Sequence, residues 1–227
     1  TPRPAHLMEI FSGPEARLTT ATRALGLHAL APIDIIHSAT HDLRKADVLR
    51  QVVHTIATHL PRVVFLAPPC TPYSVALRNF NKHRPGYIAH RIQEAQPLRL
   101  AVLSLIRAVL KHKLHFMIEN PASSSLWDTS EFDKIQAACT TAQRPLHRST
   151  FDMCRYSDEP PDAPRAKKPT TLWTTLPPSL TSSLTKRCSG HHTHQLLRGR
   201  NSNGVALTKV AATYPHTLAS TLAHVIN

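Results

Sequence analysis

Apolar residues recur along the chain in two patterns, short runs of strand length and longer stretches with helical spacing. The runs predict strands at residues 7–11, 28–36, 62–67, 115–118 and 149–153. The helical spacing predicts helices at residues 15–25, 45–60, 88–113 and 131–142, and a last helix through Leu218, Leu222 and Val225. Because strands and helices alternate, we expect an α/β fold built on a doubly wound parallel sheet.

Three stretches depart from this regular pattern. Pro97 predicts a kink or break in the long helix. The polar, basic residues 77–87 predict an exposed, mobile loop. Beyond Cys154 the chain becomes rich in Pro, His and charged side chains. We therefore expect a core over residues 1–156, a short Pro/His-rich insertion over 157–209, and a C-terminal helix over 210–227 that returns to the core.

The charge balance favours a polyanionic partner. The chain has 27 Lys and Arg against 14 Asp and Glu, a formal charge of +13, and its 16 histidines add positive charge below neutral pH. Nucleic acid is the partner that we expect, and compositional bias that serves solubility is the alternative. No apolar run approaches the ~18–20 residues of a membrane span. The four scattered cysteines favour reduced thiols or metal ligands in an intracellular protein, without distinguishing nucleus from cytoplasm.

Chemically useful residues follow two of the predicted strands. Cys70 comes directly after a strand that stops at Pro68 and Pro69, and Glu119 and Asn120 end the next strand along the chain. The carboxyl ends of parallel strands meet at one edge of a sheet, so these groups should act on one ligand. Cys70 is then a candidate nucleophile. The alternatives are a small residue in a stiff loop for Cys70 and a loop-capping acid for Glu119.

In this order the motifs resemble those of the cytosine-C5 DNA methyltransferase family. That family has a Phe-Xaa-Gly turn after its first strand, a Pro-Cys-Xaa-Xaa-Phe/Tyr-Ser loop and a Glu-Asn-Val tripeptide. The corresponding residues here are Phe11-Ser12-Gly13, Pro69-Cys70-Thr71-Pro72-Tyr73-Ser74 and Glu119-Asn120-Pro121. The resemblance covers roughly residues 7–156 and the C-terminal helix, and it implies a Rossmann-like methyltransferase sheet.

The resemblance also implies a mechanism. Cys70 would add as a thiolate to C6 of a cytosine, and Glu119 would hydrogen-bond the base at N3 and its exocyclic amine. The methyl group would come from S-adenosylmethionine and pass to C5. The base would have to be flipped out of a duplex or presented single-stranded. Where the family has Arg-Xaa-Arg to hold the base oxygen, this chain has Lys168-Pro169-Thr170, so Lys168 replaces one arginine and the second is missing.

By the same resemblance, a set of residues near the first two strands would contact the cofactor. Phe11 would lie against the adenine ring, Asp34 would accept the ribose hydroxyls, and Asp42 would read the adenine amine; either acid could instead be a surface residue or a helix cap. The whole set is Glu9, Phe11, Ser12, Gly13, Asp34, Asp42 and Pro68. The family's turn is glycine-rich, whereas Pro14 and Glu15 follow Gly13 here, which would narrow the cofactor's path.

The Pro/His-rich insertion has a signal of its own. Four thiol and imidazole groups could form a tetrahedral zinc site that fixes a polar segment to the sheet. We expect Cys154, Cys188, His192 and His194 as the ligands, with His191 as a substitute. The alternative is that these histidines belong to a solvated, generally basic surface.

These observations favour an enzyme that transfers a methyl group from S-adenosylmethionine to C5 of cytosine in DNA. Two alternatives stay open. A methyltransferase-derived nucleic-acid-binding module is favoured by Pro14 and by the missing arginine, and by the short insertion where the family has a large target-recognition domain. An RNA substrate is the other, because charge does not distinguish the two nucleic acids.

Overall fold

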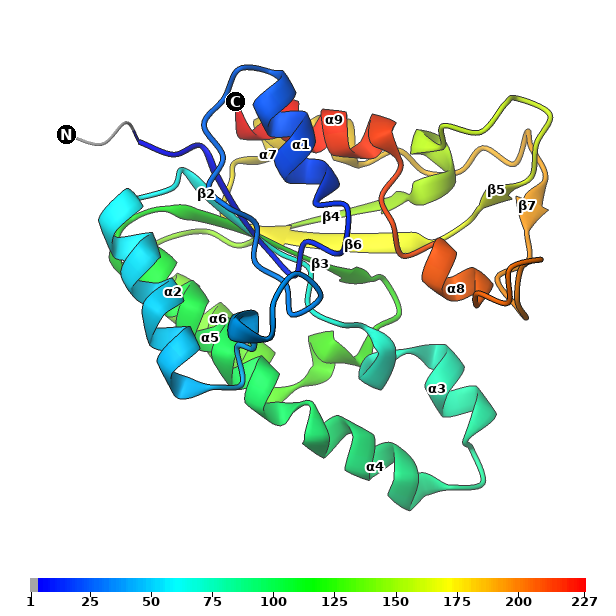
Figure 1. Ribbon diagram of the computed structural model, residues 1–227, viewed down its shortest axis with the longest axis horizontal. Coiled ribbons are helices and arrows are strands. Elements are labelled where there is room, and N and C mark those ends of the chain that lie inside the picture. The colour runs from blue at the N-terminus through cyan, green and yellow to red at the C-terminus, as the bar shows by residue number, and fades with distance from the viewer. Residues whose placement is uncertain (1–3) are drawn as a thin grey trace.

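A computed structural model describes residues 4–227 as a five-stranded sheet covered by helices on both faces (Figure 1). The strand order is β1 (Leu7–Ile10), β2 (Val63–Leu66), β3 (His115–Pro121), β6 (Pro169–Thr174) and β4 (His147–Asp152). The first three are parallel, and β6 runs antiparallel to both β3 and β4. The predicted α/β fold is confirmed, with a sheet that is mostly rather than wholly parallel.

Helices bury both faces of the central strands. One face carries α2 (Ala46–His59), α5 (Gln96–Lys111) and α6 (Ser130–Thr141), and the other carries α1 (Arg17–Ala24) and α9 (His216–Ile226). Every residue of β1 and β2 is buried, as expected for continuous apolar strands covered on both sides. The strands therefore form a rigid base whose carboxyl ends carry the loops that follow β1, β2 and β3.

The predicted strand at 28–36 is not a regular strand. The segment runs beside β1 and makes only isolated parallel bridges, Leu7 with Ala29 and Ile10 with Ile33. Pro32 lies between the two bridges and has no backbone N–H to donate, which explains why the pairing is interrupted. The segment still marks the edge of the sheet next to β1.

The predicted loop at 77–87 is also wrong, because most of it is helical. The chain forms α3 (Val75–Phe80) and α4 (Pro85–Glu94), which extend away from the sheet in Figure 1. Ser74 caps α3 by accepting a hydrogen bond from the Leu77 N–H, and Pro85 begins α4 at a position where its missing N–H costs nothing. The expected break at Pro97 is present, since α4 ends at Glu94 and α5 begins at Gln96.

The C-terminal third adds one core strand and several short elements. β6 lies inside the sequence that we expected to be an insertion, yet it is inserted between β3 and β4 in the sheet. The remaining elements are β5 (Arg165–Ala166), α7 (Pro178–Thr181), β7 (His194–Gln195) and α8 (Leu207–Val210), with β5 and β7 paired in parallel. Single turns of 3₁₀ helix occur at residues 39–41, 71–73, 125–128, 153–156 and 182–184. None of the described helices is long and apolar enough to cross a lipid bilayer.

Candidate active site

A cavity of about 690 Å³ opens at the carboxyl ends of β1, β2 and β3. One end is formed by the turn after β1 with the segment that follows it, and the other by Cys70, Glu119, Lys168 and Tyr214. Side chains of α4 and of the chain beside α8 line the remaining wall. Its size is that of a site for a cofactor or small molecule, and its place is where open α/β sheets bind ligands.

The loop that carries Cys70 is held rigidly from both sides. The Asn120 side chain donates a 2.8 Å hydrogen bond to the carbonyl of Pro68, which ties the end of β3 to the end of β2. On the other side the Tyr73 hydroxyl accepts a 3.0 Å bond from Arg99 of α5, and Arg99 also pairs with Glu131 at 3.0 Å. The Pro-Cys-Xaa-Xaa-Tyr motif and the Glu-Asn pair are thus joined by direct contacts.

Cys70 is a half-buried free thiol on the cavity wall. Burial raises the pKa of this thiol, because a thiolate loses hydration there; Lys168 opposes the shift and Glu119 adds to it. All three residues line the same cavity. Cys70 is therefore a thiol at rest, beside a lysine that favours its ionised form.

Glu119 is buried near the end of β3, and its two oxygens have different surroundings. Oε2 accepts a 3.0 Å hydrogen bond from the Tyr214 hydroxyl. Oε1 lies 3.7 Å from Lys168 Nζ and has no hydrogen-bond partner among the described residues. A buried carboxylate oxygen without a donor is costly unless a ligand or water supplies one. Oε1 is therefore an unsatisfied buried acceptor on a residue that lines the cavity.

Tyr214 is the residue of this site that the sequence reading missed. It precedes α9, its ring stacks edge-on against Phe65 with centroids 6.1 Å apart, and burial raises the pKa of its phenol well above the usual value. Arg17 of α1 donates a hydrogen bond to its backbone carbonyl. A hydroxylated aromatic directly before the apolar C-terminal helix was the available signal, but only the packing of α9 on the sheet brings it to Glu119.

At the other end of the cavity, the predicted cofactor acids are bonded within the protein. Asp34 accepts 2.9 Å bonds from the N–H groups of Gly13 and Ile36. Asp42 makes a two-pronged pair with Arg44, at 2.8 and 2.9 Å, and this hydrogen bonding lowers the pKa of the Asp42 carboxyl. Both acids line the cavity, but each carboxylate already holds the local backbone or a neighbouring side chain.

Glu9 is not among the described residues that line the cavity. Its carboxylate turns toward α1 and accepts 2.7 and 2.6 Å bonds from the backbone and hydroxyl of Thr19, while burial raises its pKa. The structure therefore places Glu9 as an anchor of α1. Its partners in the predicted set, Phe11, Ser12, Gly13 and Pro68, do line the cavity.

The turn after β1 brings apolar surface to the cofactor end. Phe11 adopts a left-handed backbone conformation (φ 63°), and Pro14 and Glu15 lie on the cavity wall beside it. Ile35 and Ile36, which the sequence reading did not single out, line the same cavity with 52% and 57% of their surface exposed. Large apolar side chains exposed in a concave site typically contact an apolar or aromatic ligand group.

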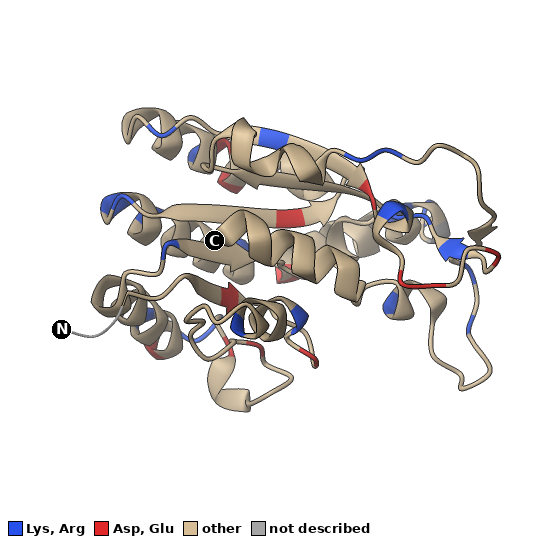
Figure 2. Ribbon diagram, turned by 90° about the horizontal axis from the view of Figure 1, so that it is seen from above, with Lys and Arg blue, Asp and Glu red and all other residues tan. Residues whose placement is uncertain are grey.

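Basic and acidic residues differ in number, and the basic ones are spread over the chain. Basic residues outnumber acidic ones and occur along the whole chain, including the segment around β5, rather than in one stripe (Figure 2). Among the described residues, five Lys and Arg side chains line the cavity: Arg17, Arg44, Arg91, Lys168 and Lys209. Positive charge is therefore available at the cavity, including beside the thiol.

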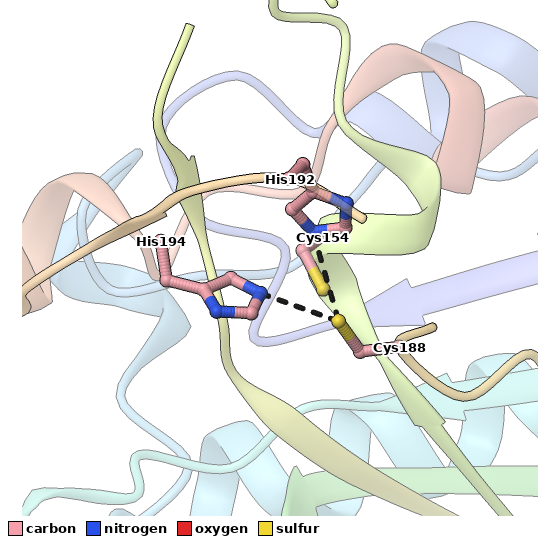
Figure 3. A group of neighbouring side chains, drawn as sticks. All are labelled: Cys154, Cys188, His192 and His194. Carbon is pink, nitrogen blue, oxygen red and sulfur yellow. Dashed lines mark hydrogen bonds between the residues drawn. The ribbon is translucent and has the colours of Figure 1, made fainter. Parts of the chain in front are cut away.

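A second cluster lies beyond the carboxyl end of β4 and the start of β6, at the same edge of the sheet as the cavity. The sulfurs of Cys154 and Cys188 and a ring nitrogen each of His192 and His194 all lie within 4.8 Å of one another (Figure 3). Burial and the neighbouring Cys188 thiol raise the pKa of Cys154 to about 11. The structure thus brings together the four residues that the sequence suggested as metal ligands, and His191 is outside the group.

Comparisons with known proteins give similarities of structure rather than of sequence. No protein-family model matches the chain, and no curated protein matches its sequence. The methyltransferase EhMeth of Entamoeba histolytica is similar with a TM-score of 0.46 and 17% identity, covering 77% of this chain and 54% of that one. The Dnmt2 methyltransferase of S. pombe is similar with a TM-score of 0.44 and 12% identity, covering 74% and 49%.

A mutant of the DNMT2 of Spodoptera frugiperda gives a TM-score of 0.43 and 12% identity, covering 84% of this chain and 54% of that one. The chain therefore spans about half the length of the three structures. The first two are named as methyltransferases.

Proposed function

We propose that the chain is a methyltransferase that acts on C5 of cytosine in nucleic acid, with DNA as the leading substrate. The observation that carries the proposal is the arrangement of Cys70, Glu119 and Lys168 around one cavity. A nucleophile, a buried acceptor without a donor and a cation lie there together. Such a set matches cytosine, whose exocyclic amine can donate and whose O2 can accept, and whose N3 can donate once it is protonated.

Each side chain then has a distinct role. The Cys70 sulfur forms a bond to C6 as a thiolate, which turns C5 into a nucleophile. Glu119 Oε1 accepts from the exocyclic amine, and a proton taken from water at N3, held by the same oxygen, neutralises the charge that develops on the ring. Lys168 faces the base oxygen. After methyl transfer, water removes the C5 proton, the C5–C6 double bond re-forms as the carbon–sulfur bond breaks, and N3 returns its proton to water, which frees Cys70.

Tyr214 positions Glu119 in this scheme. Its hydroxyl holds Oε2, which favours the carboxylate orientation that keeps Oε1 beside Lys168. Asn120 has the corresponding role for the nucleophile, because its bond to Pro68 fixes the loop of Cys70. Preorganised groups of this kind supply more stabilisation than groups that must reorient during the reaction.

The residues at the other end of the cavity are compatible with S-adenosylmethionine. The cavity is continuous from the turn after β1 to Cys70, and the exposed Ile35 and Ile36 offer an apolar wall for an adenine ring. When bound there, S-adenosylmethionine would supply the methyl group. Phe11 and the backbone at Ser12 and Gly13 would lie along it, with Asp42 nearest the adenine.

A second candidate function is a binding module without turnover. It is favoured by the bonded state of Asp34 and Asp42, because a cofactor would have to compete with Gly13, Ile36 and Arg44 for their oxygens. Pro14 in the turn adds a steric reason. In that case the basic side chains near the cavity would bind nucleic acid and the thiol would remain unreactive.

Covalent trapping distinguishes the methyltransferase from the binding module. The protein is incubated with S-adenosylmethionine and DNA that contains 5-fluorocytosine, in which fluorine at C5 blocks the final elimination. We expect a protein–DNA adduct that resists denaturation and that maps to Cys70 by mass spectrometry. Cys70→Ala should form none, whereas Cys139→Ala, which removes a buried thiol of α6 away from the cavity, should react as the parent does.

Two outcomes would redirect the proposal. An adduct formed only with the equivalent RNA would keep the chemistry and change the substrate. No adduct with either nucleic acid, together with no heat on titration of S-adenosylmethionine, would exclude the methyltransferase and leave the binding module.

A further inference from the structure

We propose that Cys154, Cys188, His192 and His194 bind a structural Zn²⁺ ion as a tetrahedral Cys₂His₂ site. The cluster lies outside the cavity and plays no part in the methyl transfer described above. Its members come from two pieces of chain: Cys154 from the turn after β4, and the other three from residues 188–194, which run into β7. A metal would therefore cross-link segments that are distant in the sequence.

The two sulfur–nitrogen distances from Cys188 match a tetrahedral ion. For Zn–S of about 2.3 Å and Zn–N of about 2.0–2.1 Å, the edge of such a tetrahedron between sulfur and nitrogen is about 3.6 Å. The Cys188 sulfur lies 3.7 Å from His192 Nε2 and 3.3 Å from His194 Nε2 (Figure 3). The rings of the two histidines meet at 82° with centroids 4.8 Å apart, so both Nε2 atoms can face one point.

The loop of Cys188 is built around its sulfur. The Gly190 N–H points back at the Cys188 sulfur from 3.3 Å, and Gly190 itself has a left-handed backbone (φ 80°) that permits this tight turn. The Cys188 N–H donates a 2.8 Å bond to buried Asp152, at the end of β4. Hydrogen bonds to and around a ligand sulfur orient it and stabilise the thiolate that a metal needs.

The segment also lacks another source of stability. Residues 185–210 contribute no buried side chain, whereas Leu184 and Ala211 on either side are buried. β5 and β7 contain two residues each. A polar segment of this kind is ordered by a metal or a disulfide rather than by apolar burial. A disulfide between Cys154 and Cys188 would leave the convergence of both histidines unexplained.

A metal in this cluster would also stabilise part of the active site, because the cluster is connected to the backbone near Lys168. This step rests on the proposed function. The Met153 N–H, beside Cys154, bonds the carbonyl of Lys168, and β7 with its ligand His194 pairs with β5 shortly before Lys168. The metal would thereby hold the backbone that presents Lys168 to Glu119.

The test is metal content of the purified full chain, measured by elemental analysis and by native mass spectrometry. We expect equimolar zinc, and a cobalt-substituted protein with the visible absorption of tetrahedral cobalt bound by thiolates. Cys188→Ser should lose the metal; should it fail to fold, His194→Ala, whose ligand side chain is exposed, replaces it. His191→Ala is the matched control in the same loop and should keep the zinc.

Three results would overturn the site. They are absence of zinc and of the cobalt spectrum in a folded chain, equal zinc in the parent and Cys188→Ser, and a mass lower by two hydrogens that assigns a Cys154–Cys188 disulfide. None of these readouts depends on methyl transfer, so the metal site can fail while the proposed activity stands, or the reverse. If the metal cross-links the chain, a chelator should lower the melting temperature of the parent and of His191→Ala. It should leave the melting temperature of Cys188→Ser unchanged.

Discussion

The two ends of the cavity differ in how their acidic groups are used. At the catalytic end, Glu119 keeps one buried oxygen without a hydrogen-bond donor, held in place by Tyr214 on the other oxygen. At the cofactor end, Asp34 and Asp42 have donors on both oxygens. A satisfied carboxylate stabilises its own loop, whereas an unsatisfied one carries a cost that a ligand can remove. The catalytic end is therefore the better evidence of function.

The largest effect should follow from removing the unsatisfied carboxylate. Glu119→Gln keeps the shape but replaces an acceptor with an amide that cannot balance charge on the base, and we expect methyl transfer to fall about 10²–10⁴-fold. The melting temperature should fall, since Lys168 loses the carboxylate that lies 3.7 Å from it. Single-turnover rates measure the first effect. A rate within twofold of the parent would remove Glu119 from the mechanism.

A pH profile tests the electrostatic link between Lys168 and Cys70. Burial raises the pKa of the Cys70 thiol and Lys168 lowers it, so the reactive thiolate increases as pH rises toward that pKa. Lys168→Met keeps the stem and removes the charge, which should raise the thiol pKa further and move the rate profile to higher pH. At neutral pH the adduct should form about three- to tenfold more slowly. An unshifted profile would show that Lys168 does not act on the thiol.

Tyr214→Phe removes the hydroxyl that fixes Glu119 while keeping the ring against Phe65. Loss of one hydrogen bond to a charged group corresponds to about 1.5–3 kcal/mol, so we expect about a tenfold to hundredfold lower turnover number. The affinity for S-adenosylmethionine, measured by calorimetry, should not change. A variant that instead loses cofactor affinity and keeps its turnover number would place Tyr214 in binding rather than positioning.

The smallest effects are expected at the cofactor end, where substitution of Asp34 and substitution of Asp42 should have different effects on stability. Asp34→Ala leaves the N–H groups of Gly13 and Ile36 without their acceptor, and we expect a loss of about 1–2 kcal/mol, seen as a melting temperature about 2–8 °C lower. Asp42→Asn breaks a surface pair with Arg44 and should change stability by less than about 1 kcal/mol.

In calorimetry, Asp42→Asn should weaken S-adenosylmethionine binding several-fold if the carboxylate reads the adenine. Unchanged affinity for both variants would mean that the acids serve only the protein's own loops, and it would strengthen the binding-module alternative.

Much of the site could be predicted because its signals are local. A buried strand that ends in Pro-Pro-Cys and a strand that ends in Glu-Asn-Pro place their last residues at one edge of a parallel sheet, whatever the details of packing. The Cys and His spacing after residue 187 is local in the same sense. The strand at 28–36 and the loop at 77–87 failed for local reasons too, because Pro32, Ser74 and Pro85 changed the backbone in ways that hydrophobic pattern does not register.

The sequence alone determined the α/β alternation of residues 7–153 in outline, the thiol and carboxylate after two of its strands, and four potential metal ligands. Only the tertiary structure decided that β6 is inserted in reverse between β3 and β4, which carries Lys168 to Glu119. The tertiary structure also places the Tyr214 hydroxyl in hydrogen-bonding distance of the same carboxylate. It engages Asp34 and Asp42 in hydrogen bonds with nearby loop residues. Side-chain periodicity encodes which face of an element is buried, but partners distant in the chain are selected by packing and by hydrogen bonds that form only once the sheet is assembled.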